Sequence, residues 1–135
     1  MVRAAILDDY QNVALAFADW SRVAKDVEIK VFDKPFAGQD EAIKALQGFA
    51  IIVGMRERTP FPRKVVEALP DLKLLITTGM RNASFDMAAL KDSHVTVCGT
   101  GGPGGGNEDT AELAWGLILG AARRIAEDHA FMRQG

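Results

Sequence analysis

Residues 73–86 read KLLITTGMRNASFD, and the rest of the chain is organised around this stretch. The apolar run 74–76, with Leu72 before it, predicts a strand buried on both faces, as in parallel sheets covered by helices. The small residues 77–79 then allow a ligand to approach the backbone, and Arg81 adds a cation whose planar fork suits carboxylate or phosphate. Because ligands of open α/β sheets bind beyond the carboxyl ends of strands, this loop is a candidate anion site. A solvated arginine in an ordinary loop is the alternative.

Length, charge and cysteine content narrow the class of protein. The 135 residues suit one domain, and the net charge of −2 provides no basic field for nucleic acid. No apolar run is long enough to span a membrane. The single cysteine, Cys98, excludes an internal disulfide, and His94 and His129 have no metal-ligand spacing, so no metal site is expected. The acidic start does not resemble a signal peptide, and we expect a cytoplasmic protein.

Strands and helices alternate along the first hundred residues. Strands are predicted at residues 2–7, 27–32, 50–53, 72–76 and 95–98. Helices are predicted at residues 13–20, 40–47, 62–69 and 87–90, with Asn12, Thr59 and Asp86 as caps of the first, third and fourth. Such crossovers require parallel strands, and the polar–apolar alternation of residues 27–32 suits an edge strand. We therefore predict an α/β fold, a flavodoxin-like parallel five-stranded sheet in the order 2-1-3-4-5 with helices on both faces.

A glycine-rich stretch follows the fifth strand. Residues 99–104 match the pattern G-x-G-x-x-G after a strand and before a helix. A dinucleotide site also needs a second strand with an acidic residue about 20 positions further on, and Pro103 removes one backbone amide. We therefore interpret residues 99–106 as a hinge between a domain at 1–98 and a helical segment at 107–135.

The last predicted helix runs from Asn107 to about residue 130. Glu108 and Asp109 in its first turn suit the helix dipole. Its middle, residues 111–122, is apolar almost all round, which predicts burial on more than one side. Each large apolar side chain left exposed forfeits about 1.5–3 kcal/mol. We therefore expect another domain or a second copy of the chain to cover this helix.

Three blocks of sequence, at residues 72–86, 95–100 and 110–119 with Arg123, resemble the first half of a D-isomer-specific 2-hydroxyacid dehydrogenase. The phosphoglycerate dehydrogenase-like branch is the most similar, and the resemblance covers essentially the whole chain. It implies a substrate domain, a linking helix, and then a nicotinamide domain that carries the catalytic Arg, Glu and His. The chain ends just before the glycine fingerprint of that second domain. The resemblance therefore implies NAD or NADP in the intact enzyme, none bound to this chain alone, and no catalytic residue here.

The resemblance also implies which residues bind substrate. Arg56 matches an arginine that contacts the substrate, although its neighbour Glu57 departs from the small polar residue common there. Thr110 matches a position near the nicotinamide ring, with a helical surface role as the alternative. The backbone amides of the loop after the fourth strand match the group that holds the substrate carboxylate, and this loop contains Gly79, Met80, Arg81 and Asn82.

The residues themselves agree with a small anion as ligand. Arg56 and Arg81 follow adjacent strands of the predicted sheet, so two guanidinium groups and free amides would meet at one edge. A salt bridge from Arg56 to Glu57 is the alternative. The predicted function is thus the substrate-binding domain of an NAD(P)-dependent D-2-hydroxyacid dehydrogenase, which binds a 2-hydroxy or 2-oxo acid. We expect it to be catalytically silent alone and to form a homodimer through residues 113–125.

Two other functions are compatible with parts of the sequence. A response-regulator receiver domain would use Asp8 and Asp9, but it also needs an aspartate after the third strand, where this chain has Gly54. We instead interpret Asp8 and Asp9 as a solvated or helix-capping pair. The second alternative is a binding or assembly module without catalysis.

Overall fold

The structure is a computed structural model that describes residues 1–101 and 108–134. It divides into two compact units, Met1–Gly101 and Gly102–Gly135. Residues 102–106 of the predicted hinge, and Asn107, lie outside the described residues, so the predicted hinge stays a prediction. In the described part of the chain, no helix has the length and apolar character needed to cross a membrane.

The first unit contains the predicted parallel sheet. Its strands are β1 (Val2–Ile6), β2 (Val27–Val31), β3 (Ile51–Gly54), β4 (Leu74–Thr77) and β5 (Thr96–Gly99). They pair in the order β2-β1-β3-β4-β5, which confirms the predicted flavodoxin-like order. β2 lies at one edge, as its alternating sequence indicated, and its side chains alternate between half-buried and exposed.

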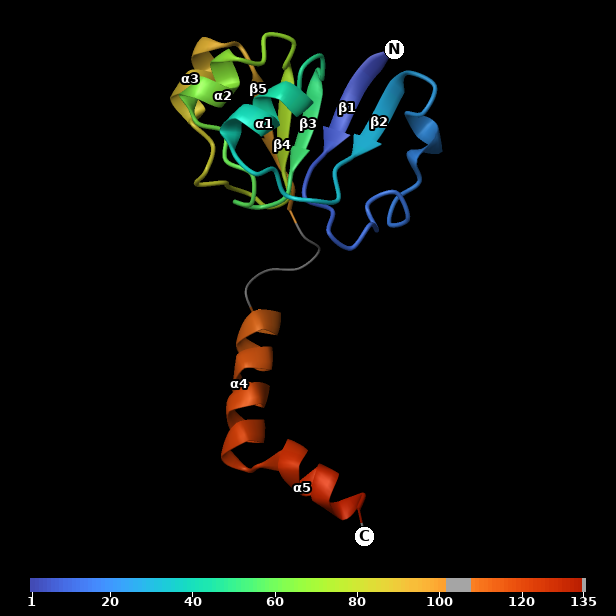
Figure 1. Cartoon of the computed structure of the whole chain (residues 1–135), viewed down its shortest axis with the longest axis vertical. Helices are drawn as coiled ribbons and strands as arrows, with labels where there is room; N and C mark the ends of the chain where they lie inside the picture. Colours follow the sequence, from blue (N-terminus) through green and yellow to red (C-terminus); the bar gives the residue numbers. More distant parts are fainter. Residues whose placement is uncertain (102–107, 135) are drawn as a thin grey trace. The chain divides into compact units, whose positions relative to one another are not determined.

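Three helices cover one face of this sheet: α1 (Gln39–Ala45), α2 (Arg63–Glu67) and α3 (Met87–Asp92) (Figure 1). Because side chains of a strand alternate between faces, every second residue of the central strands points into this core. Ala5, Ile52 and Leu75 are fully buried there. The connection from β1 to β2 contains a short 3₁₀-helix, η1 (Trp20–Arg22). Trp20 lines a pocket together with Ile6, whose side chain is on the face of the sheet opposite to the three helices.

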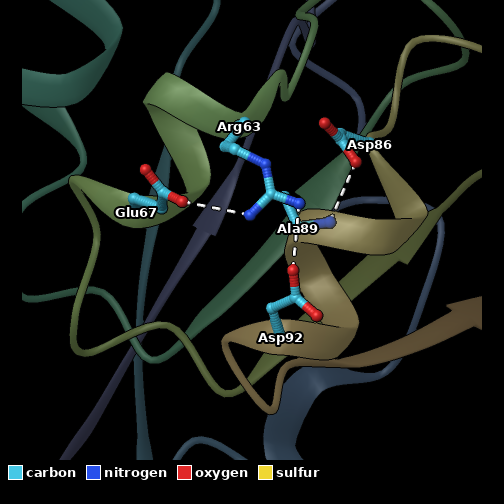
Figure 2. A network of polar contacts seen from close by, with 5 residues as sticks. All are labelled: Arg63, Glu67, Asp86, Ala89 and Asp92. Carbon is cyan, nitrogen blue, oxygen red and sulfur yellow. Dashed lines mark hydrogen bonds and ion pairs between the residues drawn. The ribbon is translucent and has the colours of Figure 1, made fainter.

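A polar network joins α2 and α3 (Figure 2). Arg63 Nη2 donates to Asp92 Oδ2 at 2.9 Å, and Arg63 Nη1 donates to Glu67 Oε1 at 3.1 Å. The hydrogen bond to Asp92, followed by that to Glu67, raises the pKa of the Arg63 guanidinium above its usual range. Nearby, Asp86 accepts a 2.9 Å hydrogen bond from Ala89 N, which confirms the predicted cap of α3.

Two predicted helix starts are wrong. Residues 13–20 do not form a helix, because the Asp9 carboxylate accepts from Val13 N at 3.1 Å and Ala14 N at 2.9 Å and holds a turn there. Asn12 is left-handed, with φ of 54°, and does not cap a helix. Thr59 does not cap α2, whose N-cap is Pro62. The Thr59 hydroxyl instead bonds to a buried aspartate described below.

The second unit consists of α4 (Glu108–Ala122) and α5 (Ile125–Met132). The prediction of one continuous helix to residue 130 is therefore wrong. The helix is interrupted at Arg124, whose φ of 54° is left-handed. The Arg124 carbonyl then accepts from Asp128 N at 2.9 Å in the first turn of α5. Trp115 and Leu117 of α4 remain 64% and 65% exposed, so the expected burial is not supplied by described residues.

Candidate carboxylate-binding site

The loops after β3 and β4 lie side by side at the carboxyl edge of the sheet. β3 and β4 are paired up to their last residues, Gly54 and Thr77, so the two loops leave the sheet together. Arg56 N donates to Thr78 Oγ1 at 3.2 Å, which joins the loops directly. In open parallel sheets, this edge is where ligands bind.

Arg56 is held in an unusual backbone conformation. Its φ of 51° is left-handed, a region that non-glycine residues rarely occupy and that often marks functional sites. The Asn82 side-chain amide donates to the Arg56 carbonyl oxygen and, at 3.1 Å, to Thr77 Oγ1. Asn82 Oδ1 in turn accepts from Ser84 N at 2.9 Å. The Asn82 side chain thus fixes the Arg56 loop, and its polar atoms are already engaged.

The Arg56 side chain lies against Gly79. A Cβ atom built on Gly79 would lie 3.4 Å from Arg56 Nη1, and Gly79 has φ of 137°. Glycine therefore provides both the backbone conformation and the space for the guanidinium. Within residues 1–101 and 108–134, Arg56 forms no ion pair with Glu57, so the salt-bridge alternative is not supported.

The Gly79–Asn82 loop presents unpaired backbone amides. Gly79 N donates to Thr100 Oγ1 at 3.0 Å, whereas the N–H groups of Met80, Arg81 and Asn82 find no acceptor among the described residues. Arg81 is exposed, and the part of the chain that the structure describes contains no ion-pair partner for it. Unpaired amides beside guanidinium groups are suited to bind a carboxylate.

Gly99, the last residue of β5, packs closely against the backbone of this loop. A Cβ atom on Gly99 would lie 2.9 Å from both the Gly79 and the Met80 carbonyl oxygens. Such distances are too short for real carbon–oxygen contacts, so any side chain there would displace the loop. Thr100 N also donates to the Gly79 carbonyl at 3.0 Å. The end of β5 therefore determines where the amides of the loop lie.

A buried aspartate beside this site has a role that the sequence did not indicate. Asp8 is 1% exposed and left-handed, with φ of 59°. Its Oδ2 accepts from Thr59 Oγ1 at 2.8 Å, and its Oδ1 accepts from Tyr10 OH at 3.1 Å. Arg58 Nη1 donates to the Asp8 carbonyl at 2.8 Å. The interpretation of Asp8 as solvated is thus wrong, because it anchors residues 58 and 59 just after Arg56.

Asp9 is also buried, and the capping interpretation fits it in part, because its carboxylate binds the amides of a turn and not of a helix. Tyr10 lies under the Arg58 guanidinium, whose carbon is 4.5 Å from the ring centroid. Partial loss of hydration, together with the hydrogen bond to Asp8, raises the pKa of the Tyr10 phenol above its ordinary value.

Thr110, the predicted cofactor contact, and His94, to which no function was assigned, lie outside the loops after β3 and β4. Thr110 is exposed on α4, in the second unit. His94 precedes β5 and so lies at the amino edge of the sheet, opposite Arg56. Among the residues that the structure describes, no group of His, Cys, Asp and Glu side chains is arranged to bind a metal ion.

The sequence matches a family model described as D-isomer specific 2-hydroxyacid dehydrogenase, catalytic domain, over residues 4–131. It is 30% identical over 97 residues to a hydroxypyruvate reductase of Thermotoga maritima, covering 72% of this chain and 31% of that protein. It is 28% identical over 109 residues to a D-3-phosphoglycerate dehydrogenase of Archaeoglobus fulgidus, covering 81% of this chain and 20% of that protein.

A solved structure extends the similarity to three dimensions. The crystal structure of a phosphoglycerate oxidoreductase from Vibrio cholerae O395 is 34% identical and superposes with a TM-score of 0.76. The match covers 96% of this chain and 41% of that one. The chain therefore spans less than half the length of these matched proteins.

Proposed function

The chain belongs to the D-isomer specific 2-hydroxyacid dehydrogenase family, and we propose that it binds the carboxylate of a 2-hydroxy or 2-oxo acid. The observation that supports this most directly is the Arg56 guanidinium beside Gly79, next to the unpaired amides of Met80, Arg81 and Asn82. In an intact enzyme, these groups would fix the orientation of the acid and compensate its charge while hydride is transferred.

We also propose that the chain alone does not transfer hydride. His94 lies at the opposite edge of the sheet from Arg56 and cannot exchange a proton with an acid bound there. Thr110, an exposed residue of α4, is the cofactor contact that the family resemblance implies for this chain. NAD or NADP is therefore assigned to the intact enzyme. The exposed, unpaired thiol of Cys98 suits a reducing compartment such as the cytoplasm.

Pyruvate, a 2-oxo acid whose side chain is a single methyl group, tests carboxylate binding by NMR titration of the ¹⁵N-labelled chain. We expect shifts at the amides of Met80, Arg81 and Asn82. Arg56→Ala should weaken binding about tenfold or more, because a hydrogen bond to a charged group contributes about 1.5–3 kcal/mol. Arg22→Ala, which removes an exposed arginine of η1, is the matched control and should leave the affinity unchanged. Equal affinities for Arg56→Ala and the unaltered chain would overturn the proposal.

We further propose that the chain self-associates through residues 113–125. Leu113, Leu117 and Ile118 of α4 are 64%, 65% and 56% exposed, which leaves their apolar surface available to a second copy. Light scattering of the purified chain should report a dimer, and Leu117→Ser should shift it toward monomer. Leu15→Ser, at a 52% exposed leucine of the first unit, should not. A monomeric unaltered chain would contradict this proposal.

A further inference from the structure

An apolar cavity of about 260 Å³ lies next to the carboxylate-binding site. Its lining consists of Ile6, Leu7, Ala14, Trp20, Val53, Met55 and Thr78. Thr78 is the polar member, and its hydroxyl already accepts from Arg56 N at 3.2 Å and points to Met55 Sδ at 3.1 Å. The Trp20 indole N–H donates to the Ala14 carbonyl at 3.0 Å. The lining therefore offers a ligand apolar surface and engaged polar groups.

The size of the cavity suits a small hydrocarbon group. An apolar protein cavity of about 150 Å³ is sufficient to hold a benzene molecule. The cavity beside Thr78 is larger, at about 260 Å³. A branched or aromatic group of about four to six carbons would fit and would displace water from apolar walls.

The cavity borders both loops of the carboxylate-binding site, the one after β3 and the one after β4. Met55 directly precedes Arg56, and Thr78 directly precedes Gly79, so one wall is shared with each carboxylate-binding loop. In a 2-oxo acid, the side chain begins two carbon–carbon bonds of about 1.5 Å from the carboxylate carbon. This adjacency of Met55 to Arg56 and of Thr78 to Gly79 is the basis for assigning the side chain of a bound acid to this cavity.

A second cavity, of about 460 Å³, lies on the other side of the Gly79–Asn82 loop. Its lining includes Met80, Arg81 and Asn82 but none of residues 55–60. This second cavity thus borders the loop after β4 but not the loop after β3. Arg81 makes its lining more polar than that of the smaller cavity. The smaller cavity has no charged residue in its lining and contains Met55 and Thr78 from the two loops, so it is the better match for an apolar side chain.

We propose that the cavity lined by Trp20 and Met55 receives the side chain of the substrate, and that this substrate is a 2-oxo or 2-hydroxy acid with an apolar side chain of about four to six carbons. This inference rests on the proposed carboxylate site. A hydroxyl or phosphate group in the same place would lose its hydration without gaining a partner, which is unfavourable. The site thereby selects against acids with short polar side chains.

The test compares three 2-oxo acids by NMR titration of the whole chain: pyruvate, hydroxypyruvate and 4-methyl-2-oxopentanoate. Each fully buried methylene strengthens binding about fourfold, so the three added carbons of the branched acid give up to about sixtyfold over pyruvate. The indole N–H resonance of Trp20 should shift with the branched acid and remain in place with pyruvate. Hydroxypyruvate should bind no more tightly than pyruvate.

A pair of variants locates the side chain. Ala14→Leu places three carbons in the cavity and should weaken the branched acid at least tenfold, with the affinity for pyruvate unchanged. Ala16→Leu makes the same change at an exposed position two residues further on and should alter neither affinity. The pyruvate affinity of Ala14→Leu also verifies that this variant is folded.

The outcomes separate the two levels of the proposal. If pyruvate binds and the branched acid gains less than threefold, the cavity inference is overturned and the carboxylate site stands. If Ala14→Leu weakens both acids equally, the cavity does not hold the side chain. If none of the three acids binds, the proposed function fails and the cavity inference fails with it.

Discussion

Two groups of residues at the carboxyl edge of the sheet differ in how their polar atoms are used. Around Asp8, both carboxylate oxygens are engaged, by Thr59 and Tyr10, and the main-chain carbonyl accepts from Arg58. Around Gly79, the amides of the following three residues find no acceptor within the described chain, and the Arg56 side chain forms no ion pair there. The first group is closed on itself, whereas the second presents unused donors.

The difference shows how one edge of the sheet can contain both residues that anchor its loops and free donors for a ligand. Asp8 and Arg56 share a left-handed backbone, with φ of 59° and 51°. A non-glycine residue in this conformation costs about 1–2 kcal/mol, and it persists because surrounding contacts fix it. The closed group around Asp8 fixes residues 58 and 59, and the Asn82 amide fixes the Arg56 carbonyl. Donors that are held in this way are preorganised for an anion.

The largest expected effect comes from breaking the closed group. Asp8→Ala removes the acceptor of two hydroxyl groups and leaves a small void, so the free energy of unfolding should fall by about 2–4 kcal/mol. Arg81→Ala removes an exposed side chain without an ion pair in the described residues and should change it by less than about 0.5 kcal/mol. Urea unfolding of both variants measures the contrast. Similar losses in the two variants would contradict the assignment of Asp8 as the anchor.

A smaller effect is expected from displacing the Gly79–Asn82 loop and its unpaired amides. Gly99→Ala places a Cβ atom 2.9 Å from the Gly79 and Met80 carbonyl oxygens. The loop must shift, and we expect a loss of about 1–3 kcal/mol in unfolding free energy together with weaker pyruvate binding. Among the described residues, a Cβ atom at Gly101 would meet the flexible Met80 Sδ alone, at 3.6 Å, so Gly101→Ala serves as the control. A Gly99→Ala variant that binds pyruvate normally would show that β5 does not position the amides.

The smallest expected effect is a shift in one titration. The pKa of Tyr10 is raised above 10.0 by partial loss of hydration and by the hydrogen bond to Asp8. Any stability that Tyr10 contributes is therefore fully present below pH 10.0 and is lost as the pH rises through the folded-state pKa. Tyr10 is the sole tyrosine in the sequence, so its ionisation can be followed by ultraviolet absorbance. Asp8→Asn should lower this pKa, and an unchanged pKa would exclude the Asp8 contact in solution.

The sequence predicted the sheet well because its signals were local. The apolar runs of β3 and β4 and the alternating pattern of β2 each follow from which faces of a strand are buried. The Asp86 cap was also predictable, since its partner Ala89 is three residues away. Errors arose where distant residues decide the local structure. Thr59 bonds to Asp8, 51 positions earlier, in place of capping α2.

The candidate site was predictable to a similar degree. Arg56 and the Gly79–Asn82 loop were identified from their places after adjacent strands and from the family resemblance, and the structure brings them together. The buried state of Asp8 was missed because an acidic pair after a strand usually faces water. Its partners in residues 58–59 are identified only once β1 and β3 are known to be neighbours.

The most direct test of the central claim is a crystal structure of the chain with oxamate, an unreactive analogue of pyruvate. The account predicts the oxamate carboxylate within hydrogen-bond distance of the Arg56 guanidinium and of at least two of the amides of Met80, Arg81 and Asn82. Oxamate bound elsewhere, or an empty site at saturating concentration with Arg56 still against Gly79, would contradict the account.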